Sequence, residues 1–118
     1  MSKSTKNFRA EEFACPCCSE NKIKDSLVDA LQALRDLIKK PIIVNSGYRC
    51  AKHNQEVGGA KNSQHLKGTA ADIWVKGMSP TTLAYMAEQI PAFRDGGIGV
   101  YPTWVHVDTR GYRARWRG

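Results

Sequence analysis

The sequence predicts one small α+β domain. Its 118 residues are enough to enclose one hydrophobic core and too few for two. Hydrophobic residues make up 42% and charged residues 25% of the chain, as in ordinary soluble globular proteins. Apolar residues follow a helical spacing in some segments and a strand-like pattern in others. We therefore expect a single domain over residues 1–118, with residues 1–7 and 112–118 as loose ends.

The first half of the chain predicts a helix, a strand and a short helical segment. Phe8 and Phe13 are expected to pin an irregular arm onto the domain. Apolar side chains recur at helical spacing over residues 27–38, and a proline soon follows as a stop signal. Residues 41–44 are mostly β-branched and are bounded by turn-forming residues, which is typical of a short buried strand. Residues 51–57 are expected to form one or two helical turns.

The second half predicts further strands around a second helix. Residues 60–68 form a polar loop, and residues 69–75 alternate as the two faces of a strand do. A serine–proline pair begins a helix over residues 79–90, and the next proline ends it. Residues 98–101 and 104–108 flank a tight link and are expected to pair as a hairpin.

Ionisable side chains stand out in the loop and strand segments of this second half. His65 and Asp72 are seven positions apart, with a glycine and small residues between them. His106 and Asp108 lie in the last apolar run and must point to the same side of a strand, since side chains alternate. Two imidazoles and one carboxylate suit zinc and leave a fourth position for water, as in catalytic sites. We expect one metal ion to be bound by His65, Asp72 and His106.

The same patterns leave the roles of Asp108 and Arg49 open. Asp108 is placed to take a proton from the attacking water, to orient a ligating histidine, or simply to pair with Arg110. Arg49 follows a glycine that lets the chain turn, so that Tyr48 and Arg49 face a cleft. The planar guanidinium of Arg49 suits a substrate carboxylate or a developing oxyanion, and the alternative is a surface salt bridge.

The four cysteines have several interpretations. Cys15 and Cys18 have C-x-x-C spacing, with Cys17 between them and Cys50 far along the chain. A structural zinc site usually takes two well-spaced pairs, and the second pair is missing here. Buried thiols or one disulfide are therefore favoured over a second, cysteine-held zinc ion.

The formal charge of +7 suits any polyanionic partner, whether nucleic acid or a bacterial cell wall. Several basic residues near the C-terminus are typical of a solvated tail, namely Arg110, Arg113, Arg115 and Arg117. No apolar run resembles a secretory signal or a membrane span, so we expect a chain made and kept in the cytoplasm until it is released. A nucleic-acid binder built on a cysteine-held zinc is the rival that this charge raises.

Three segments together resemble the M15 peptidases. Residues 63–72 match, position by position, the S-x-H-x-x-G-x-A-x-D motif of the zinc D-Ala-D-Ala peptidases. Residues 46–49 resemble the S-x-Y-R segment of the family, and residues 104–106 resemble its final metal-ligand segment. The family also includes phage L-alanyl-D-glutamate endolysins and shares its fold with the Hedgehog signalling domain. The resemblance runs from about Phe8 to the last tryptophan.

The resemblance implies a fold and a set of roles. The fold is α+β, with a central, mostly antiparallel sheet flanked by helices and the zinc in an open groove. Arg49 is implied to bind the substrate and stabilise the transition state, and Ser63 is implied to contact the substrate. We expect Tyr48 to contact the substrate as well. The implied zinc ligands are those expected above, His65, Asp72 and His106.

One position departs from the family pattern. Many members carry a catalytic glutamate three residues before the last zinc histidine, and Thr103 stands there in this chain. The His-Val-Asp ending resembles another branch of the family, which favours Asp108 as the general base or its immediate orienter. His53, otherwise expected to be a structural histidine, is the reserve candidate for the base.

The function that the resemblance implies is hydrolysis of peptidoglycan stem peptides next to a D-amino acid. Either a carboxypeptidase or an endopeptidase is consistent with the motifs. We expect a monomer that binds one catalytic zinc ion and no nucleic acid, and that serves phage or prophage lysis. The alternative is a Hedgehog-like binding module that keeps the metal and has lost hydrolysis.

Overall fold

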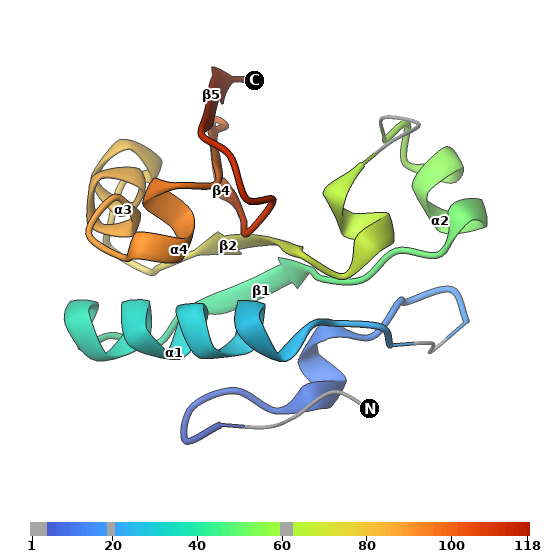
Figure 1. Cartoon of the computed structure of the whole chain (residues 1–118), viewed down its shortest axis with the longest axis horizontal. Coiled ribbons are helices and arrows are strands. Elements are labelled where there is room, and N and C mark those ends of the chain that lie inside the picture. Colours follow the sequence, from blue (N-terminus) through green and yellow to red (C-terminus); the bar gives the residue numbers. More distant parts are fainter. Residues whose placement is uncertain (1–4, 19–20, 60–62) are drawn as a thin grey trace.

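The computed structural model describes residues 5–18, 21–59 and 63–118 (Figure 1). The helices, with η for the 3₁₀ type, are η1 (Ala10–Phe13), α1 (Asp25–Ile38), α2 (Ala51–Glu56), η2 (Gln64–Lys67), α3 (Pro80–Ala87) and α4 (Pro91–Arg94). The strands are β1 (Ile43–Ser46), β2 (Ala70–Trp74), β3 (Gly97–Val100), β4 (Val105–Asp108) and β5 (Ala114–Arg117). None of the helices in the described part of the chain has the length and apolar character that a membrane span requires.

The five strands form one mixed sheet in the order β1-β2-β4-β3-β5. The first three neighbouring pairs are antiparallel, and only β3 and β5 are parallel. The predicted α+β class with a mostly antiparallel sheet is confirmed. The expected hairpin is confirmed too, since β3 and β4 pair antiparallel across a short link.

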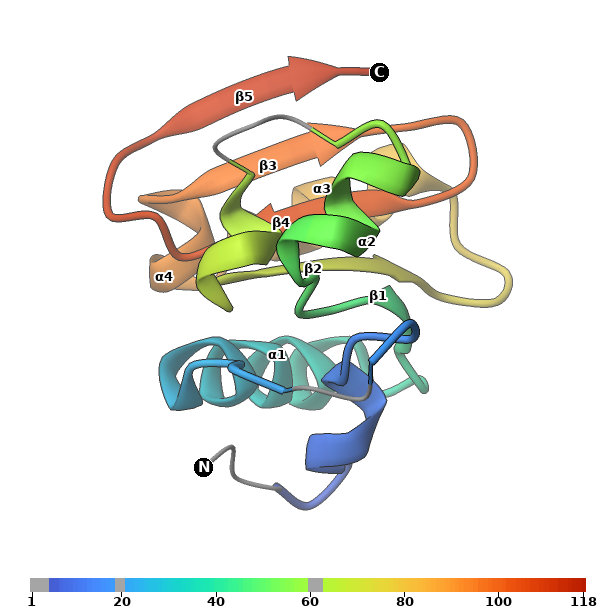
Figure 2. The same cartoon turned by 90° about the vertical axis from the view of Figure 1, so that its right-hand side faces the viewer.

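Helices cover the two faces of the sheet differently. Seen from the side, α3 and α4 lie behind the sheet, α2 and η2 lie in front of it, and α1 runs beneath the β1 edge (Figure 2). The core lies on the side of α1, α3 and α4, where Leu31, Leu83 and Phe93 are almost fully buried. Each such side chain contributes about 1.5–3 kcal/mol relative to an exposed one. The opposite side is left for polar side chains.

The first helix follows its sequence pattern closely. The predicted helix over residues 27–38 is confirmed as α1, which begins two residues earlier. Lys39 ends it in the left-handed conformation, with φ of 63°, and its N–H donates to the carbonyl of Arg35 at 2.9 Å. Pro41 follows two residues later, as expected where a helix stops.

The first strand differs from the prediction of a buried strand over residues 41–44. β1 begins at Ile43, which is 38% exposed, while Ile42 just before it is buried. The reason is that β1 is an edge strand, paired only with β2. An irregularity in the pairing between Val44 and Ser46 redirects the chain toward the front of the sheet.

The second predicted helix is two helices. α3 ends at Ala87, and Pro91 begins the separate helix α4. Proline is well accepted in the first turn of a helix, where its missing N–H would have no partner. The expected start is confirmed, because Ser79 caps α3 by accepting a hydrogen bond from the N–H of Thr82.

The described residues near both ends of the chain make more contacts with the domain than expected. Residues 114–117 form β5, so the expected loose end over residues 112–118 is wrong for these four. Arg115 pairs with Glu88 at 2.8 Å, which removes it from the expected solvated tail. At the other end, Thr5 and Asn7 hydrogen bond to Gln32 of α1, and residues 1–4 lie outside the described residues.

Candidate metal centre

His65 is positioned by a short 3₁₀ turn. Ser63 precedes η2, and its hydroxyl accepts a hydrogen bond from the N–H of His65 at 3.2 Å. Gly68 ends the turn in the left-handed conformation, with φ of +71°. A Cβ at Gly68 would lie 1.9 Å from the carbonyl oxygen of Lys22, so only glycine fits this approach of two backbones.

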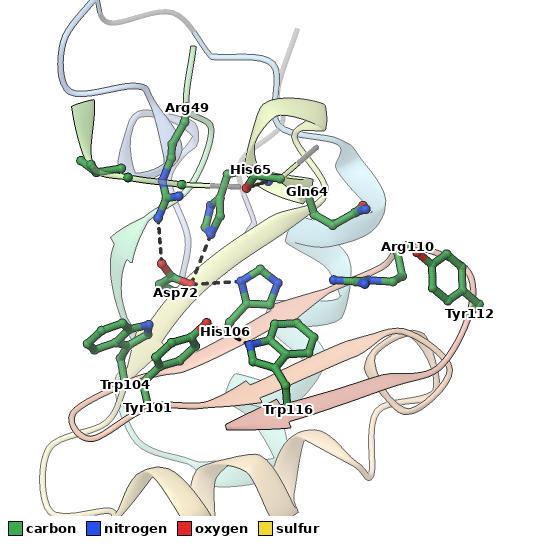
Figure 3. A pocket seen from close by; sticks show the side chains of 14 residues that line it. Arg49, Gln64, His65, Asp72, Tyr101, Trp104, His106, Arg110, Tyr112 and Trp116 are labelled. Carbon is green, nitrogen blue, oxygen red and sulfur yellow. Dashed lines mark hydrogen bonds and ion pairs between the residues drawn. The ribbon is translucent and has the colours of Figure 1, made fainter. Parts of the chain in front are cut away.

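The sheet brings the other two residues of the predicted metal site face to face. Asp72 on β2 and His106 on β4 are direct partners in the antiparallel register. The strand pairing therefore fixes their separation, and η2 brings His65 over the same face. Figure 3 shows the three side chains converging.

The geometry of this trio fits a tetrahedral metal ion. Oδ1 of Asp72 lies 3.2 Å from Nε2 of His65 and 3.2 Å from Nδ1 of His106. With zinc–ligand bonds of about 2.0–2.1 Å, the edge of a coordination tetrahedron is about 3.3 Å. All three residues are buried, with exposed fractions of 8% or less for each whole residue. The structure thus brings together the three residues that the sequence predicted.

The outer nitrogen of each histidine has an acceptor of its own. His65 donates from Nδ1 to the carbonyl oxygen of Gly47 at 2.7 Å. His106 donates from Nε2 to Oδ2 of Asp108 at 2.7 Å. These hydrogen bonds fix the tautomers and turn the lone pairs of Nε2 in His65 and Nδ1 in His106 toward Asp72. Two lone pairs facing one carboxylate call for a cation between them.

The electrostatics of the trio favour that cation. Burial would raise the pKa of Asp72, but the imidazoles of His106 and His65, each within 3.2 Å of its carboxylate, outweigh this effect and hold the pKa well below its usual range. Burial would lower the pKa of His106, yet the neighbouring carboxylates of Asp108 and Asp72 raise it. The site therefore concentrates negative charge around Nδ1 of His106, which favours a positive ion at this point.

Asp108 lies behind the metal site. Its side chain has no exposed surface and is surrounded by donors: His106, the N–H of Gly97 and the guanidinium of Arg110. Burial would raise the pKa of Asp108, but the bonds from His106 and Arg110 hold it far below its usual range. The contacts that two of the roles left open by the sequence would require, an ion pair with Arg110 and a hydrogen bond to His106, are both present.

Arg49 reaches the site from the other side. Its Nη2 lies 3.2 Å from Oδ2 of Asp72, the oxygen that does not contact the histidines. Nε donates to the hydroxyl of Ser46, and Nη1 donates to Oδ1 of Asn54. The guanidinium is thus held in place at the edge of the cleft, with 15% of the side chain exposed.

A cleft of about 520 Å³ opens above the trio. Tyr101 and Trp104 stack in parallel at 4.6 Å and form one wall, with Trp116 beside them (Figure 3). Arg110 lies over the ring of Trp116 at 5.2 Å and lines the far side. The sequence did not place Trp116 or Arg110 in the site. The only hint was their position just beyond the His-Val-Asp segment.

The remaining predicted site residues divide between the cleft and other places. Ser63 and Arg49 line the cleft, as expected. Tyr48 is 5% exposed and packs in the core, so the expected substrate contact has no support. His53 lies close to Cys17 instead. Thr103 is exposed on the link between β3 and β4, and neither it nor His53 lines the cleft.

Comparisons with known proteins agree with this site. A family model described as Peptidase M15 matches residues 6–108. Peptidoglycan L,D-endopeptidase MepK of Escherichia coli (strain K12) is 38% identical over 101 residues, which cover 75% of this chain and 54% of that protein. The probable peptidoglycan L,D-endopeptidase MepK of Haemophilus influenzae is 42% identical over 84 residues, covering 65% of this chain and 43% of that protein.

A shorter match is to a carboxypeptidase. Zinc D-Ala-D-Ala carboxypeptidase of Streptomyces albus G is 52% identical over 44 residues, which cover 36% of this chain and 17% of that protein. The chain spans about half the length of the endopeptidases that it matches.

Proposed function

The chain belongs to the peptidase M15 family, and we propose that it is a zinc-dependent peptidase that cuts peptidoglycan stem peptides next to a D-amino acid. The observation that carries this proposal is the convergence of His65, Asp72 and His106, with the outer nitrogen of each histidine already committed to an acceptor. Such a site binds a metal through three protein ligands and leaves one position open, as catalytic zinc sites do. Zinc in the name of one relative supports the choice of metal.

Zinc held by this trio would supply a Lewis acid for the scissile carbonyl and would lower the pKa of the attacking water. The protein's own part is to hold the ligands in place and to orient the peptide. Gly47 and Asp108 keep the two imidazoles aligned by accepting their outer protons. This alignment is fixed before substrate arrives, so none of it costs reorganisation during the reaction.

Arg49 is the residue that we propose to bind the substrate and stabilise the oxyanion. Its bonds to Ser46 and Asn54 hold the guanidinium beside Asp72, at the rim of the cleft. A planar cation in this position suits a carboxylate or an oxyanion, which accepts two parallel hydrogen bonds. Ser63 lines the same rim and is proposed to contact the peptide.

Asp108 is proposed as a positioning residue that orients His106. A general base must reach the proton that it removes, and Asp108 is fully buried behind His106. Its carboxylate is also occupied by Arg110 and by the N–H of Gly97. These contacts support Asp108 as a residue that orients a histidine, rather than as the general base that accepts the proton.

The endopeptidase reaction is the form of the activity that we propose. The L,D-endopeptidases match up to 75% of this chain, whereas the carboxypeptidase matches 36%. Aromatic side chains along the cleft, Tyr101, Trp104 and Trp116, offer a wall for a peptide that extends on both sides of the cut. The acceptable substrate is then a longer stem peptide or a cross-link.

Digestion of purified sacculi tests this proposal. Mass spectrometry of the released muropeptides identifies the bond from the new ends. We expect cleavage that stops in a chelator, returns with zinc, and is absent in His65→Ala. Stoichiometric zinc binding without any cut stem peptide would overturn the enzyme proposal. New ends at terminal D-Ala alone would replace the endopeptidase by a carboxypeptidase.

The second candidate function is a Hedgehog-like binding module that has lost hydrolysis. One observation favours it: among the described residues that line the cleft, Asp72 is the only carboxylate. Thr103, where many family members have glutamate, is exposed and away from the cleft. Tight binding of intact stem peptides, without turnover at any zinc concentration, is the result that this candidate predicts.

A role in phage or prophage lysis stays a prediction. The formal charge of +7 supports retention on an anionic cell wall once the protein is released. Binding to sacculi that weakens as salt is raised from about 0.05 M to 0.5 M would support this electrostatic attachment, since salt screens exposed charges.

A further inference from the structure

We propose that Cys15, Cys17, Cys18 and Cys50 bind a second zinc ion, which is structural. The four Sγ atoms all lie within 4.8 Å of one another. The cluster is separate from the trio of His65, Asp72 and His106 and shares no ligand with it. Binding of this ion is independent of the proposed peptidase activity, whereas its effect on catalysis rests on that proposal.

Three of the four sulfurs lie close enough together to share one ion. Sγ of Cys15 lies 3.6 Å from Sγ of Cys17 and 3.6 Å from Sγ of Cys50, and the Cys17–Cys50 distance is 3.2 Å. With zinc–sulfur bonds of about 2.3 Å, the edge of a tetrahedron is about 3.8 Å. A disulfide bond is only about 2.05 Å long, and all four cysteines are free thiols in this structure.

The donor set selects the metal. Four thiolates in a tetrahedral arrangement are typical of structural zinc, because soft sulfur ligands suit this ion and leave no position for water. Two backbone groups already point at the sulfurs: the N–H of Cys50 donates to Cys15, and the N–H of His53 donates to Cys50. Such hydrogen bonds offset the negative charge that four thiolates bring, as surrounding donors do at other metal sites.

The backbone holds the two halves of the cluster together. Three ligands follow η1, and the fourth lies 32 residues later, after β1. Next to the cluster, the N–H of Tyr48 donates to the carbonyl of Phe13 at 2.8 Å. Gly47 packs so closely on Phe13 that an added Cβ would lie 2.7 Å from its Cα. The N-terminal arm and the segment 47–50 are therefore fixed side by side, so the four thiols are gathered in advance.

The position of Cys50 gives this ion a role in the active site. The segment from Gly47 to Cys50 also carries the carbonyl that orients His65 and the side chain of Arg49. A zinc ion on Cys50 would anchor this segment to the arm that carries Phe8 and Phe13. We infer that it fixes the placement of Arg49, and through Gly47 that of His65, without touching the substrate.

Zinc stoichiometry tests the proposal. Purified protein is expected to contain two zinc ions per chain by elemental analysis. His65→Ala is expected to retain only the cysteine-bound ion. Cys17→Ser is expected to retain only the ion bound by His65, Asp72 and His106. Lys52→Ser, an exposed change two residues from Cys50, is the matched control and should keep both. One ion in the native protein that disappears in His65→Ala would overturn the proposal.

The reactivity of the cysteines tests the second zinc site in the native protein, so this test needs no variant to fold. All four thiols should react slowly with a thiol reagent, and all four should react at once when a chelator removes the ion. Cobalt substitution should give thiolate-to-metal charge-transfer absorption that persists in His65→Ala. Two thiols missing from the count in denaturant would indicate a disulfide and overturn the proposal. Two bound ions with no hydrolysis of sacculi would overturn the peptidase proposal alone.

Discussion

Asp108 accepts a hydrogen bond of 2.7 Å from Nε2 of His106, the residue two positions earlier on the same strand. Because side chains alternate along β4, this spacing puts both on one side of the sheet. The hydrogen bond from Nε2 therefore orients the imidazole ring, so that its Nδ1 faces Asp72. This orientation requires a carboxylate at position 108, since each of the groups around Asp108 is a hydrogen-bond donor.

Asp108→Asn is expected to weaken zinc binding rather than to stop proton transfer. The amide would present an NH₂ group to donors, which loosens His106 and lowers zinc affinity by about 10–100-fold. Arg110 would lose its anion, which should lower the free energy of unfolding by roughly 3 kcal/mol. Zinc titration and urea unfolding measure the two effects.

Turnover at saturating zinc separates positioning from base catalysis at Asp108. A zinc-loaded Asp108→Asn protein should keep kcat within several-fold of the native value. A loss of about 10²–10⁴-fold with full zinc content would instead make Asp108 the general base. Thr103→Ala, an exposed change on the same hairpin, is the control and should leave both properties intact.

Arg49→Lys is expected to reduce hydrolysis while the metal site stays filled. A lysine keeps the charge but cannot bond Ser46, Asn54 and a substrate oxygen together, so kcat/KM should fall about 10²-fold. Zinc content should remain unchanged, because Arg49 contacts Asp72 only through the oxygen that faces away from the histidines. Arg94→Lys, on the exposed surface, is the matched control. Unchanged kcat/KM in Arg49→Lys would remove Arg49 from the reaction.

The convergence of His65, Asp72 and His106 was predictable because short-range sequence patterns indicate it. A ten-residue motif holds His65 and Asp72, and strand alternation gave the direction of His106. The register that places Asp72 opposite His106 was not readable, but any antiparallel pairing of the two strands in the right frame produces it. Local signals were therefore sufficient to bring together the three side chains of the proposed metal site.

The parts that the sequence missed depend on contacts between distant segments. β5 pairs in parallel with β3, and no turn signal marks such a pairing. This pairing brings Trp116 of β5 to the cleft. Arg110, in the segment between β4 and β5, then lies over the ring of Trp116. Likewise, Cys50 meets Cys15 only because the arm folds back on the segment after β1. Spacing along the chain could not reveal a cluster assembled in this way.

The pairing of Glu88 with Arg115 makes part of the stability depend on pH. Hydrogen bonds from Arg115 lower the pKa of Glu88, more than its partial burial opposes this. The carboxylate form is therefore favoured in the folded state. The contribution of the Glu88 carboxylate to the free energy of unfolding is therefore fully present above the pKa of about 4.3 that it has in the unfolded chain. This contribution is lost as the pH falls through the lower pKa of Glu88 in the folded protein.

Urea unfolding of native protein and Glu88→Gln should show this dependence. The native protein should be the more stable of the two at pH 7, and the difference should shrink as pH falls below about 4. Taking the difference cancels the acid effects on the metal sites, which both proteins share. A difference that stays constant from pH 7 to pH 3 would mean that the ion pair does not link β5 to α3. Arg117→Gln, also on β5 but exposed, should show no such trend.

Gly68→Ala tests whether close backbone approach, rather than the left-handed conformation, requires glycine in the metal-site turn. Gly68 and Gly77 have similar φ values, +71° and +80°, but only at Gly68 would an added Cβ meet another backbone. Gly77→Ala should therefore cost only the conformational penalty of about 1 kcal/mol. Gly68→Ala should cost a further 1–3 kcal/mol, roughly the penalty of forcing extra volume into a packed site. It should also weaken zinc binding, since η2 and His65 must shift. Equal losses of unfolding free energy in the two variants would show that the approach of Lys22 is easily relieved.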